Sequence, residues 1–221
     1  MTAIAAVGGG LIGLFGGTFD PVHNGHLRMA LELYQCLQFD EMRLLPAHRP
    51  PHRDSPLCCS ADRAAMVRLA VADCPSLSVD ERELLAERPS YTVDTLAQLR
   101  HELGEQVSLC WCVGMDSLVN LHTWSRWQQL LDHAHLVVAA RPGWVLPDDG
   151  EVAQWLQQHL GTAADLRQQP GGRVVLVQQT LLEISATDIR AQIAAGLSPQ
   201  FLLPEAVWRY INDKGLYRDH Q

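Results

Sequence analysis

Apolar residues along the chain alternate between short continuous runs and stretches with helical spacing. The run from Leu11 to Phe15 is typical of a buried strand. It is followed by Gly16 and Gly17, which tolerate tight or left-handed turns and let a backbone approach a ligand closely. From Asn24 onward, apolar residues recur at three- and four-residue intervals, which predicts a helix. A strand, a glycine turn and a helix in this order favour anion binding, above all of phosphate, at the helix N-terminus.

The same alternation continues to the end of the chain. Further strands are predicted at 42–45, 77–79, 107–113, 135–140 and 173–177. Further helices are predicted at 61–71 with Ser60 as N-cap, from Ser90 or Thr92 to 103, at 152–160, at 185–195 with Ser185 as N-cap, and at 204–212. This order predicts an α/β fold, a Rossmann-like doubly wound parallel sheet with helices on both faces. In such sheets the ligand lies at the carboxyl ends of the strands, where the strand order reverses.

The chain is expected to form a single domain over residues 1–221, with an N-terminal tail at about 1–10 and an excursion or insertion at about 144–172. Its net charge of −8 argues against a general nucleic-acid binder, so a site for anionic substrates must concentrate basic groups locally. Neither a signal-peptide pattern nor a membrane-spanning apolar run is apparent. The six cysteines contain no CxxC pair, as expected of a reduced cytoplasmic protein. The sequence does not fix the oligomeric state, and a homo-oligomer is possible.

His23 and His26 follow the glycine turn and are three residues apart. If the helix has started, they share one face, and both rings can reach one phosphate group. A single histidine near a helix start is more often a solvated or capping side chain, but the glycine turn before this pair favours the phosphate role. Metal ligation is the third option, and no cysteine, acidic residue or third histidine stands nearby at a ligand spacing.

Five further places carry candidate chemistry. The loop from Pro46 to Arg53 could be a solvated surface loop or could cover a triphosphate, with the basic residues His48, Arg49, His52 and Arg53. Tyr91 and Thr92 lie at a helix start, whose backbone N–H groups can hold a carboxylate. Asp116, which follows Gly114, could be an acid that suits the helix dipole or could accept a hydrogen bond from a ribose hydroxyl. Trp124 could be a core residue or could stack on a planar heterocycle. In the run from Ser185 to Arg190, Ser185 is a candidate N-cap and Arg190 could reach a phosphate.

The segment GGTFDPVHNGH resembles the (T/H)xGH signature of the nucleotidyltransferase superfamily. Together with PPHR, DERELLAERPSYTVDTL, VGMDSL, HTW, RPG and ISATDIR, it resembles bacterial nicotinate-nucleotide adenylyltransferases from about Gly13 to Arg218. The resemblance implies catalytic roles for His23, His26 and Arg190. It implies ATP binding by Gly16, Gly17, Thr18, Phe19, His23, Gly25, His26, Gly114, Asp116, Ser185, Thr187 and Arg190. It implies nicotinate mononucleotide binding by Gly17, Tyr91, Thr92, Asp116, Trp124 and Arg141.

The chemistry implied by this resemblance is in-line attack of the mononucleotide phosphate on the α-phosphorus of ATP. A phosphate monoester is already ionised at neutral pH, so positioning and charge neutralisation would suffice. Mg²⁺ is expected to arrive with ATP, since no carboxylate cluster suggests a dedicated metal site. Two positions depart from the family pattern. Ala186 replaces a frequent hydroxyl residue, and Ala140 precedes Arg141 where a second basic residue can occur.

Three alternatives stay open at this point. The chain could transfer adenylate to phosphopantetheine or cytidylate to a polyol phosphate, although the PSYT and HTW segments and the length of 221 residues count against both. It could also be a nucleotide-binding regulator that has lost catalysis. The intact pair of His23 and His26, together with Arg190, argues against that role.

Overall fold

The predicted sheet is present in the computed structural model, which describes residues 9–48, 56–85, 90–140, 149–180 and 182–218. The strands stand in the order β3-β2-β1-β4-β5-β6, with bounds β1 (Leu11–Gly17), β2 (Glu41–Pro46), β3 (Leu77–Val79), β4 (Ser108–Gly114), β5 (His135–Ala140) and β6 (Val174–Gln178). The pairs β1–β4, β4–β5 and β5–β6 are parallel. Because the strand order reverses between β1 and β4, the prediction of a doubly wound α/β fold is confirmed.

The chain forms two compact units, each assembled from separate stretches of sequence. Unit 1 consists of Met1–Phe15, Leu33–Met42 and Tyr91–Gln179. Unit 2 consists of Gly16–Glu32, Arg43–Ser90 and Thr180–Gln221.

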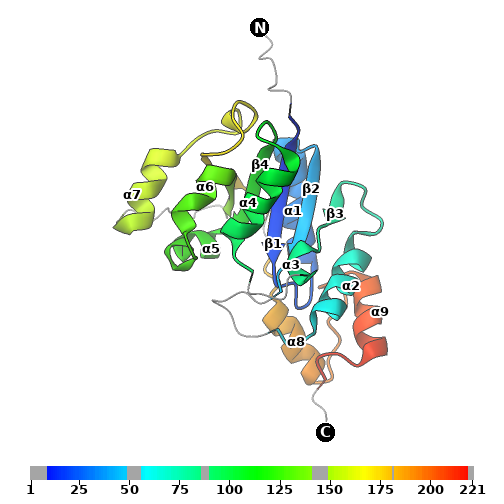
Figure 1. Ribbon diagram of the computed structural model, residues 1–221. Coiled ribbons are helices and arrows are strands. Elements are labelled where there is room, and N and C mark those ends of the chain that lie inside the picture. Colours follow the sequence, from blue (N-terminus) through cyan, green and yellow to red (C-terminus); the bar gives the residue numbers. More distant parts are fainter. Residues whose placement is uncertain (1–8, 49–55, 86–89, 141–148, 181, 219–221) are drawn as a thin grey trace. The chain divides into compact units, whose positions relative to one another are not determined.

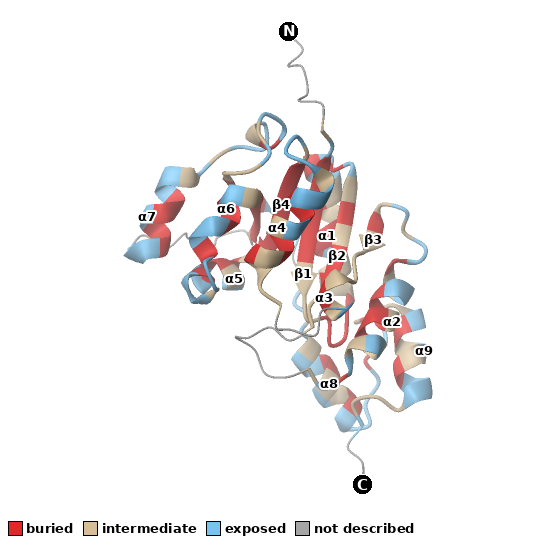
Figure 2. Ribbon diagram, in the orientation of Figure 1, coloured by how far each residue is buried: buried red, intermediate tan, exposed pale blue. Residues whose placement is uncertain are grey.

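Unit 1 contains the strands with the most continuous apolar sequence. Leu109, Cys110 and Cys112 of β4 are fully buried, and Figure 2 shows β4 in the colour of buried residues. A strand buried on both faces reads as an unbroken apolar run, as the LCWCV segment does. The helical elements of this unit are α4 (Thr92–Leu103), α5 (Met115–Val119), η1 (Leu121–Thr123), η2 (Trp127–Gln129), α6 (Leu130–His133), α7 (Gly150–His159) and η3 (Asp165–Arg167).

Unit 2 is mainly helical outside the strand residues that it contains. Its helices are α2 (Ser60–Val71), α3 (Arg82–Leu85), α8 (Ala186–Ala194) and α9 (Glu205–Lys214), and α1 (Asn24–Leu37) begins in this unit and ends in unit 1. Helix α9 packs beside α2 (Figure 1), although the two are far apart in the sequence. Met66 and Val67 on α2 are fully buried, as is Val207 on α9.

The predicted glycine turn differs from the observed structure. Gly16 and Gly17 form the end of β1, and the left-handed backbone belongs to Phe19, with φ 49°. The apolar run predicted the strand but could not mark its last residue, since glycine is compatible with both strand and turn.

One predicted N-cap was wrong, because Cys59, not Ser60, precedes α2. The predicted start of the next helix at Thr92 is confirmed, since α4 begins at that residue. Among the described residues, no side chain caps the start of α2 or α4. The Ser185 N-cap is confirmed, because its Oγ accepts the N–H of Asp188 at 3.0 Å.

The predicted excursion contains α7 and η3 and returns to the edge of the sheet. The Gly161 N–H donates to the Val174 carbonyl at 2.9 Å, which continues the pairing along β6. Trp155 of α7 packs edge-on against Trp127, with ring centroids 5.0 Å apart. No helix among the described residues is long and apolar enough to cross a membrane.

Candidate active site

In the turn between β1 and α1, three aromatic rings pack against one another and against two glycines. A Cβ on Gly17 would lie 2.8 Å from the Phe19 ring. That ring meets His26 edge-on at 5.1 Å, and His26 stacks on His23 at 3.7 Å. A Cβ on Gly25 would lie 3.0 Å from Nδ1 of His23. The glycines of this segment therefore make room for the rings, and the rings fix the positions of both imidazoles.

His23 is held as a neutral imidazole. It is 5% exposed, and burial lowers its pKa to about 4. Its Nδ1 is buried without a hydrogen-bond partner among the described residues. Near neutral pH this side chain can thus donate a hydrogen bond to a phosphate oxygen without carrying a charge itself.

Three backbone amides at the start of α1 already have acceptors within the fold. The Asn24 N–H donates to the Leu202 carbonyl at 2.9 Å. The N–H groups of His26 and Leu27 both donate to the His23 carbonyl, at 3.0 and 3.2 Å. The two imidazoles are therefore the main candidate donors to an anion at this turn.

Arg190 joins the same turn from the far end of the chain. Its Nη1 donates to the Asp20 carbonyl at 2.7 Å, and its Nη2 donates to Thr187 Oγ1 at 3.3 Å. The structure therefore brings together the predicted catalytic residues His23, His26 and Arg190 within unit 2. The imidazoles of the two histidines and the guanidinium of Arg190 can all donate hydrogen bonds, as binding of a phosphate chain requires.

His48 is the one basic residue of the predicted loop from Pro46 to Arg53 that lies within the described part of the chain. Its Nδ1 lies 3.0 Å from Ser60 Oγ, and its backbone N–H donates to Ser90 Oγ at 3.3 Å. The other predicted loop residues, Arg49, His52 and Arg53, lie outside the described residues, as does Arg141.

Arg63 is a buried residue of this site that the sequence analysis missed. It is 1% exposed, and burial lowers its pKa. Its Nη1 donates to the carbonyls of Thr18 and Ala47, both at 2.6 Å, and its Nη2 donates to the carbonyl of His48 at 3.0 Å. One guanidinium thus ties the backbone after β1 to the backbone after β2. The sequence did contain a signal for its burial, because Arg63 lies three and four residues before Met66 and Val67 and so shares their buried helix face.

Three of the residues predicted to bind nicotinate mononucleotide, here called the pyridine end, lie in unit 1: Tyr91, Thr92 and Trp124. At the start of α4, the N–H groups of Asp94 and Thr95 donate to the Tyr91 carbonyl at 3.0 and 3.1 Å. No side chain among the described residues caps this helix start, which leaves the preceding amides as candidate donors. Trp124 follows η1 and is half-buried. Two residues later, Arg126 donates to Asp94 in the first turn of α4 at 2.8 Å. This ion pair joins the Trp124 segment to the helix start.

Gly114 and Asp116 meet at the end of β4. A Cβ on Gly114 would lie 2.7 Å from Oδ1 of Asp116, so the carboxylate lies over the glycine. The predicted ribose ligand therefore stands at the carboxyl end of a central strand, where doubly wound sheets bind nucleotides.

Comparison with known proteins shows which family the chain resembles. The model of the family described as "Cytidylyltransferase-like" matches residues 14–192. A protein from Cellvibrio japonicus, named "Probable nicotinate-nucleotide adenylyltransferase", is 56% identical over 207 residues, covering 94% of this chain and 98% of the relative. A protein of the same name from Aeromonas hydrophila is 52% identical over 208 residues, covering 94% of this chain and 97% of the relative.

Solved structures show the same fold. The Plasmodium falciparum nicotinic acid mononucleotide adenylyltransferase complexed with NaAD is similar with a TM-score of 0.72 at 14% identity, covering 94% of this chain and 97% of that one. Sequence identity this low supports the fold alone. With the family model and the close relatives, the result is plain: this chain belongs to the cytidylyltransferase-like family and, within it, to the nicotinate-nucleotide adenylyltransferases.

Proposed function

We propose that this chain transfers the adenylyl group of ATP to nicotinate mononucleotide, giving nicotinate adenine dinucleotide and pyrophosphate. The names of the close relatives support this reaction. The observation that carries the proposal is the stacked His23–His26 pair on the turn whose Asp20 carbonyl holds Arg190. This arrangement surrounds one backbone turn with hydrogen-bond donors suited to phosphate oxygens.

The reaction is an in-line displacement at phosphorus. A mononucleotide phosphate oxygen forms a bond to the α-phosphorus of ATP, while the bond from that phosphorus to the bridging oxygen breaks and pyrophosphate leaves with the electron pair. The attacking phosphate is already ionised, so no general base is required. The imidazoles of His23 and His26 and the fork of Arg190 stabilise the charge on the transferring and leaving groups.

The nucleotide end of the proposed site draws on the turn after β1 and on the start of α8. Gly17 and Gly25 leave room for the ring stack, while Ser185 orders the start of α8 by capping it. Thr187 accepts a hydrogen bond from Arg190, which orients the guanidinium. The remaining members of this proposed set are Gly16, Thr18, Phe19, Gly114 and Asp116.

The pyridine end uses the start of α4 and the Trp124 segment. The only lysine of the chain is Lys214, so the nicotinate carboxylate cannot be bound by a cluster of lysines. Backbone N–H groups near Tyr91 and Thr92 are the proposed donors, and the ring of Trp124 stacks on the pyridine. Donors paired with a carboxylate discriminate against the amide, because the amide leaves them partly unsatisfied.

The remaining partners follow from the substrates. Mg²⁺ would arrive bound to ATP and would neutralise part of the phosphate charge. Among the described residues, no group of three or more His, Cys, Asp or Glu side chains could hold a metal ion. A cytoplasmic location is part of the proposal, supported by the free thiols of all six cysteines. So is the absence of nucleic-acid partners, in view of the net charge of −8.

The test is pyrophosphate release with a panel of acceptors. With ATP, nicotinate mononucleotide should be used with a kcat/KM about 10²-fold or more above that of nicotinamide mononucleotide, the scale of a buried polar mismatch. Phosphopantetheine with ATP, and a polyol phosphate with CTP, should give no turnover. Equal use of the two mononucleotides would remove the nicotinate assignment, and complete inactivity would favour the regulator.

The role of the imidazole pair is tested by His26→Ala. Turnover should fall by about 10²-fold or more, as expected when a group that stabilises developing charge is removed. His101→Ala, on the exposed last turn of α4, is the control and should retain normal turnover. Near-normal turnover of His26→Ala would exclude the catalytic role of His26.

A further inference from the structure

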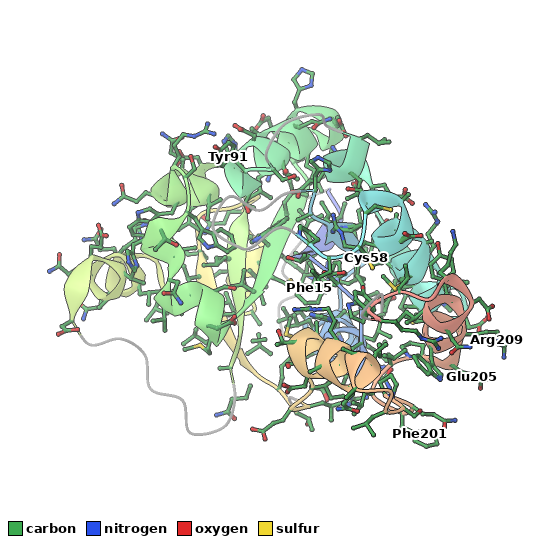
Figure 3. All side chains as sticks on the ribbon, turned by 90° about the horizontal axis from the view of Figure 1, so that it is seen from below. Phe15, Cys58, Tyr91, Phe201, Glu205 and Arg209 are labelled. Atoms are coloured by element: carbon green, nitrogen blue, oxygen red, sulfur yellow. The ribbon has the colours of Figure 1, made fainter. Side chains whose placement is uncertain are left out.

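The carboxylate of Asp20 joins three segments of unit 2. Asp20 is 5% exposed, and its Oδ2 accepts the Leu57 N–H at 2.8 Å. Its Oδ1 accepts the Cys58 N–H at 3.3 Å and the hydroxyl of Tyr217 at 2.6 Å. Cys58, labelled in Figure 3, lies just before α2. A buried carboxylate with three donors is fixed in position, because losing one of them leaves a charged oxygen less well solvated.

The backbone of Asp20 links this carboxylate to the proposed catalytic groups. Its carbonyl accepts Nη1 of Arg190 at 2.7 Å. His23 follows three residues later, after Val22, whose side chain is fully buried. A shift of Asp20 is therefore passed on to the guanidinium of Arg190 and, through a packed turn, to the His23 ring.

The C-terminal segment is shaped to bring Tyr217 to this carboxylate. Helix α9 ends at Lys214, and Gly215 follows in the left-handed region with φ 64°. Tyr217 itself has φ 61°, which is unfavourable for a residue with a side chain and persists where the surrounding contacts determine it. Burial, followed by the charge of Asp20, raises the pKa of the Tyr217 hydroxyl, so it stays protonated as a donor.

We propose that Tyr217 is a positioning residue for adenylyl transfer, acting through Asp20 on His23 and Arg190. The inference rests on the proposed function of these two residues. It assigns a role in the reaction to a hydroxyl 197 positions away from Asp20 in the sequence. If Tyr217 only anchored the end of the chain, its removal would lower stability without changing the chemical step.

Tyr210 provides a matched control in the same unit. Its hydroxyl also donates to a carboxylate, Oδ1 of Asp62, at 2.7 Å. The other partners of Asp62 among the described residues are Cys59 at 3.1 Å and Lys214 at 3.8 Å. Tyr210→Phe therefore makes the same chemical change at a carboxylate that carries no proposed catalytic group.

The experiment compares Tyr217→Phe with Tyr210→Phe in the full chain. In Tyr217→Phe, kcat should fall about 10-fold with the KM for ATP within about twofold, since displacement of a catalytic group by a fraction of an ångström has effects of this scale or larger. In Tyr210→Phe, both constants should stay within about twofold of the wild-type values. Thermal unfolding of both variants shows whether any loss comes from unfolded protein.

Two further measurements separate positioning from general stabilisation. The ¹⁵N resonances of the His23 ring, assigned with His23→Gln, should shift in Tyr217→Phe and not in Tyr210→Phe. Asp20→Asn and Asp20→Asn/Tyr217→Phe should have similar kcat values, because residues acting through one bond are not additive. Normal kcat in Tyr217→Phe, or equal losses in both tyrosine variants, would overturn the inference. If His26→Ala loses turnover in that case, the proposed function still stands; if His26→Ala is also active, the proposed site itself is wrong.

Discussion

Units 1 and 2 each bury an arginine among backbone carbonyls, but at opposite ends of their strands. In unit 2, Arg63 binds carbonyls that follow the carboxyl ends of β1 and β2. In unit 1, Arg100 donates to the carbonyl of Val107 at 2.6 Å and to that of His133 at 2.7 Å, just before β4 and β5 begin. Burial lowers the pKa of both guanidinium groups.

Arg63 and Arg100 make the same kind of interaction, but it serves a different purpose in each unit. A buried guanidinium satisfied by several carbonyls locks loops together wherever it stands, and removing it leaves those carbonyls without donors. Ligands of doubly wound sheets bind only at the carboxyl ends. Arg63 therefore fixes loops that carry proposed phosphate-binding residues, whereas Arg100 fixes loops at the amino ends. Position in the sheet, not the strength of the interaction, separates a residue needed for the reaction from one needed for stability.

The largest expected effect follows from exchanging each arginine for lysine. Lysine keeps the charge but loses the planar fork, so both Arg63→Lys and Arg100→Lys should lose about 2–3 kcal/mol of unfolding free energy. Only Arg63→Lys should lose turnover as well, by about 10²-fold, because Thr18 and His48 are no longer held. Denaturant unfolding and kcat, measured well below both unfolding midpoints, provide the comparison. A similar loss of kcat in Arg100→Lys would contradict the distinction between the two arginines.

This contrast also shows how far the sequence alone could go. Periodicity predicted the strands and most helices, because burial of one face depends on local spacing. The motif between Gly16 and His26 predicted the histidine pair, because its residues are neighbours in the chain. Arg63 was missed, since three of its acceptors, the carbonyls of Thr18, Ala47 and His48, come from segments that only the tertiary fold brings beside it.

Asp20 and Tyr217 illustrate the same limit at greater sequence separation. Asp20 before proline suggests a turn, and Tyr217 near the C-terminus suggests nothing in particular. Their hydrogen bond depends on the course of α9 and on two left-handed residues after it. The short helices α3 and α6 were also absent from the predictions, because four-residue helices are too short to show a period.

The second prediction concerns two buried histidines, one in each unit. Burial lowers the pKa of both His23 and His135. In each case the unfolded chain binds more protons than the folded chain below the ordinary histidine pKa of about 6.5. Stability should therefore fall as the pH drops below that value, and the loss from His23 should stop growing near pH 4. At pH 5 the loss from His23 amounts to about 2 kcal/mol.

Glutamine variants separate the two histidines. His23→Gln should change stability at pH 8 by less than about 1 kcal/mol, since Nδ1 of His23 has no partner among the described residues. It should also flatten the decline between pH 6.5 and 4. His135→Gln should cost about 2 kcal/mol even at pH 8, because its Nε2 bonds the Gln169 carbonyl at 2.9 Å and its Nδ1 accepts the Arg173 N–H at 3.1 Å. Unfolding free energies measured at four or five pH values test this, and matching curves for the two variants would contradict it.

The smallest expected effect tests whether unit 1 also has a part in substrate binding. The pair Arg126–Asp94 is partly exposed, with side-chain exposures of 45% and 38%, so Asp94→Asn should cost less than about 0.5 kcal/mol of stability. Its expected consequence is a rise of about threefold in the KM for nicotinate mononucleotide, because the Trp124 segment is then less firmly held beside the start of α4. The matched control is Glu205→Gln in unit 2, which removes the charge from the exposed Glu205–Arg209 pair on α9 (Figure 3). That variant should change neither stability nor KM measurably. An unchanged KM in Asp94→Asn would mean that the ion pair does not position Trp124, and the pyridine end would then rest on the backbone donors alone.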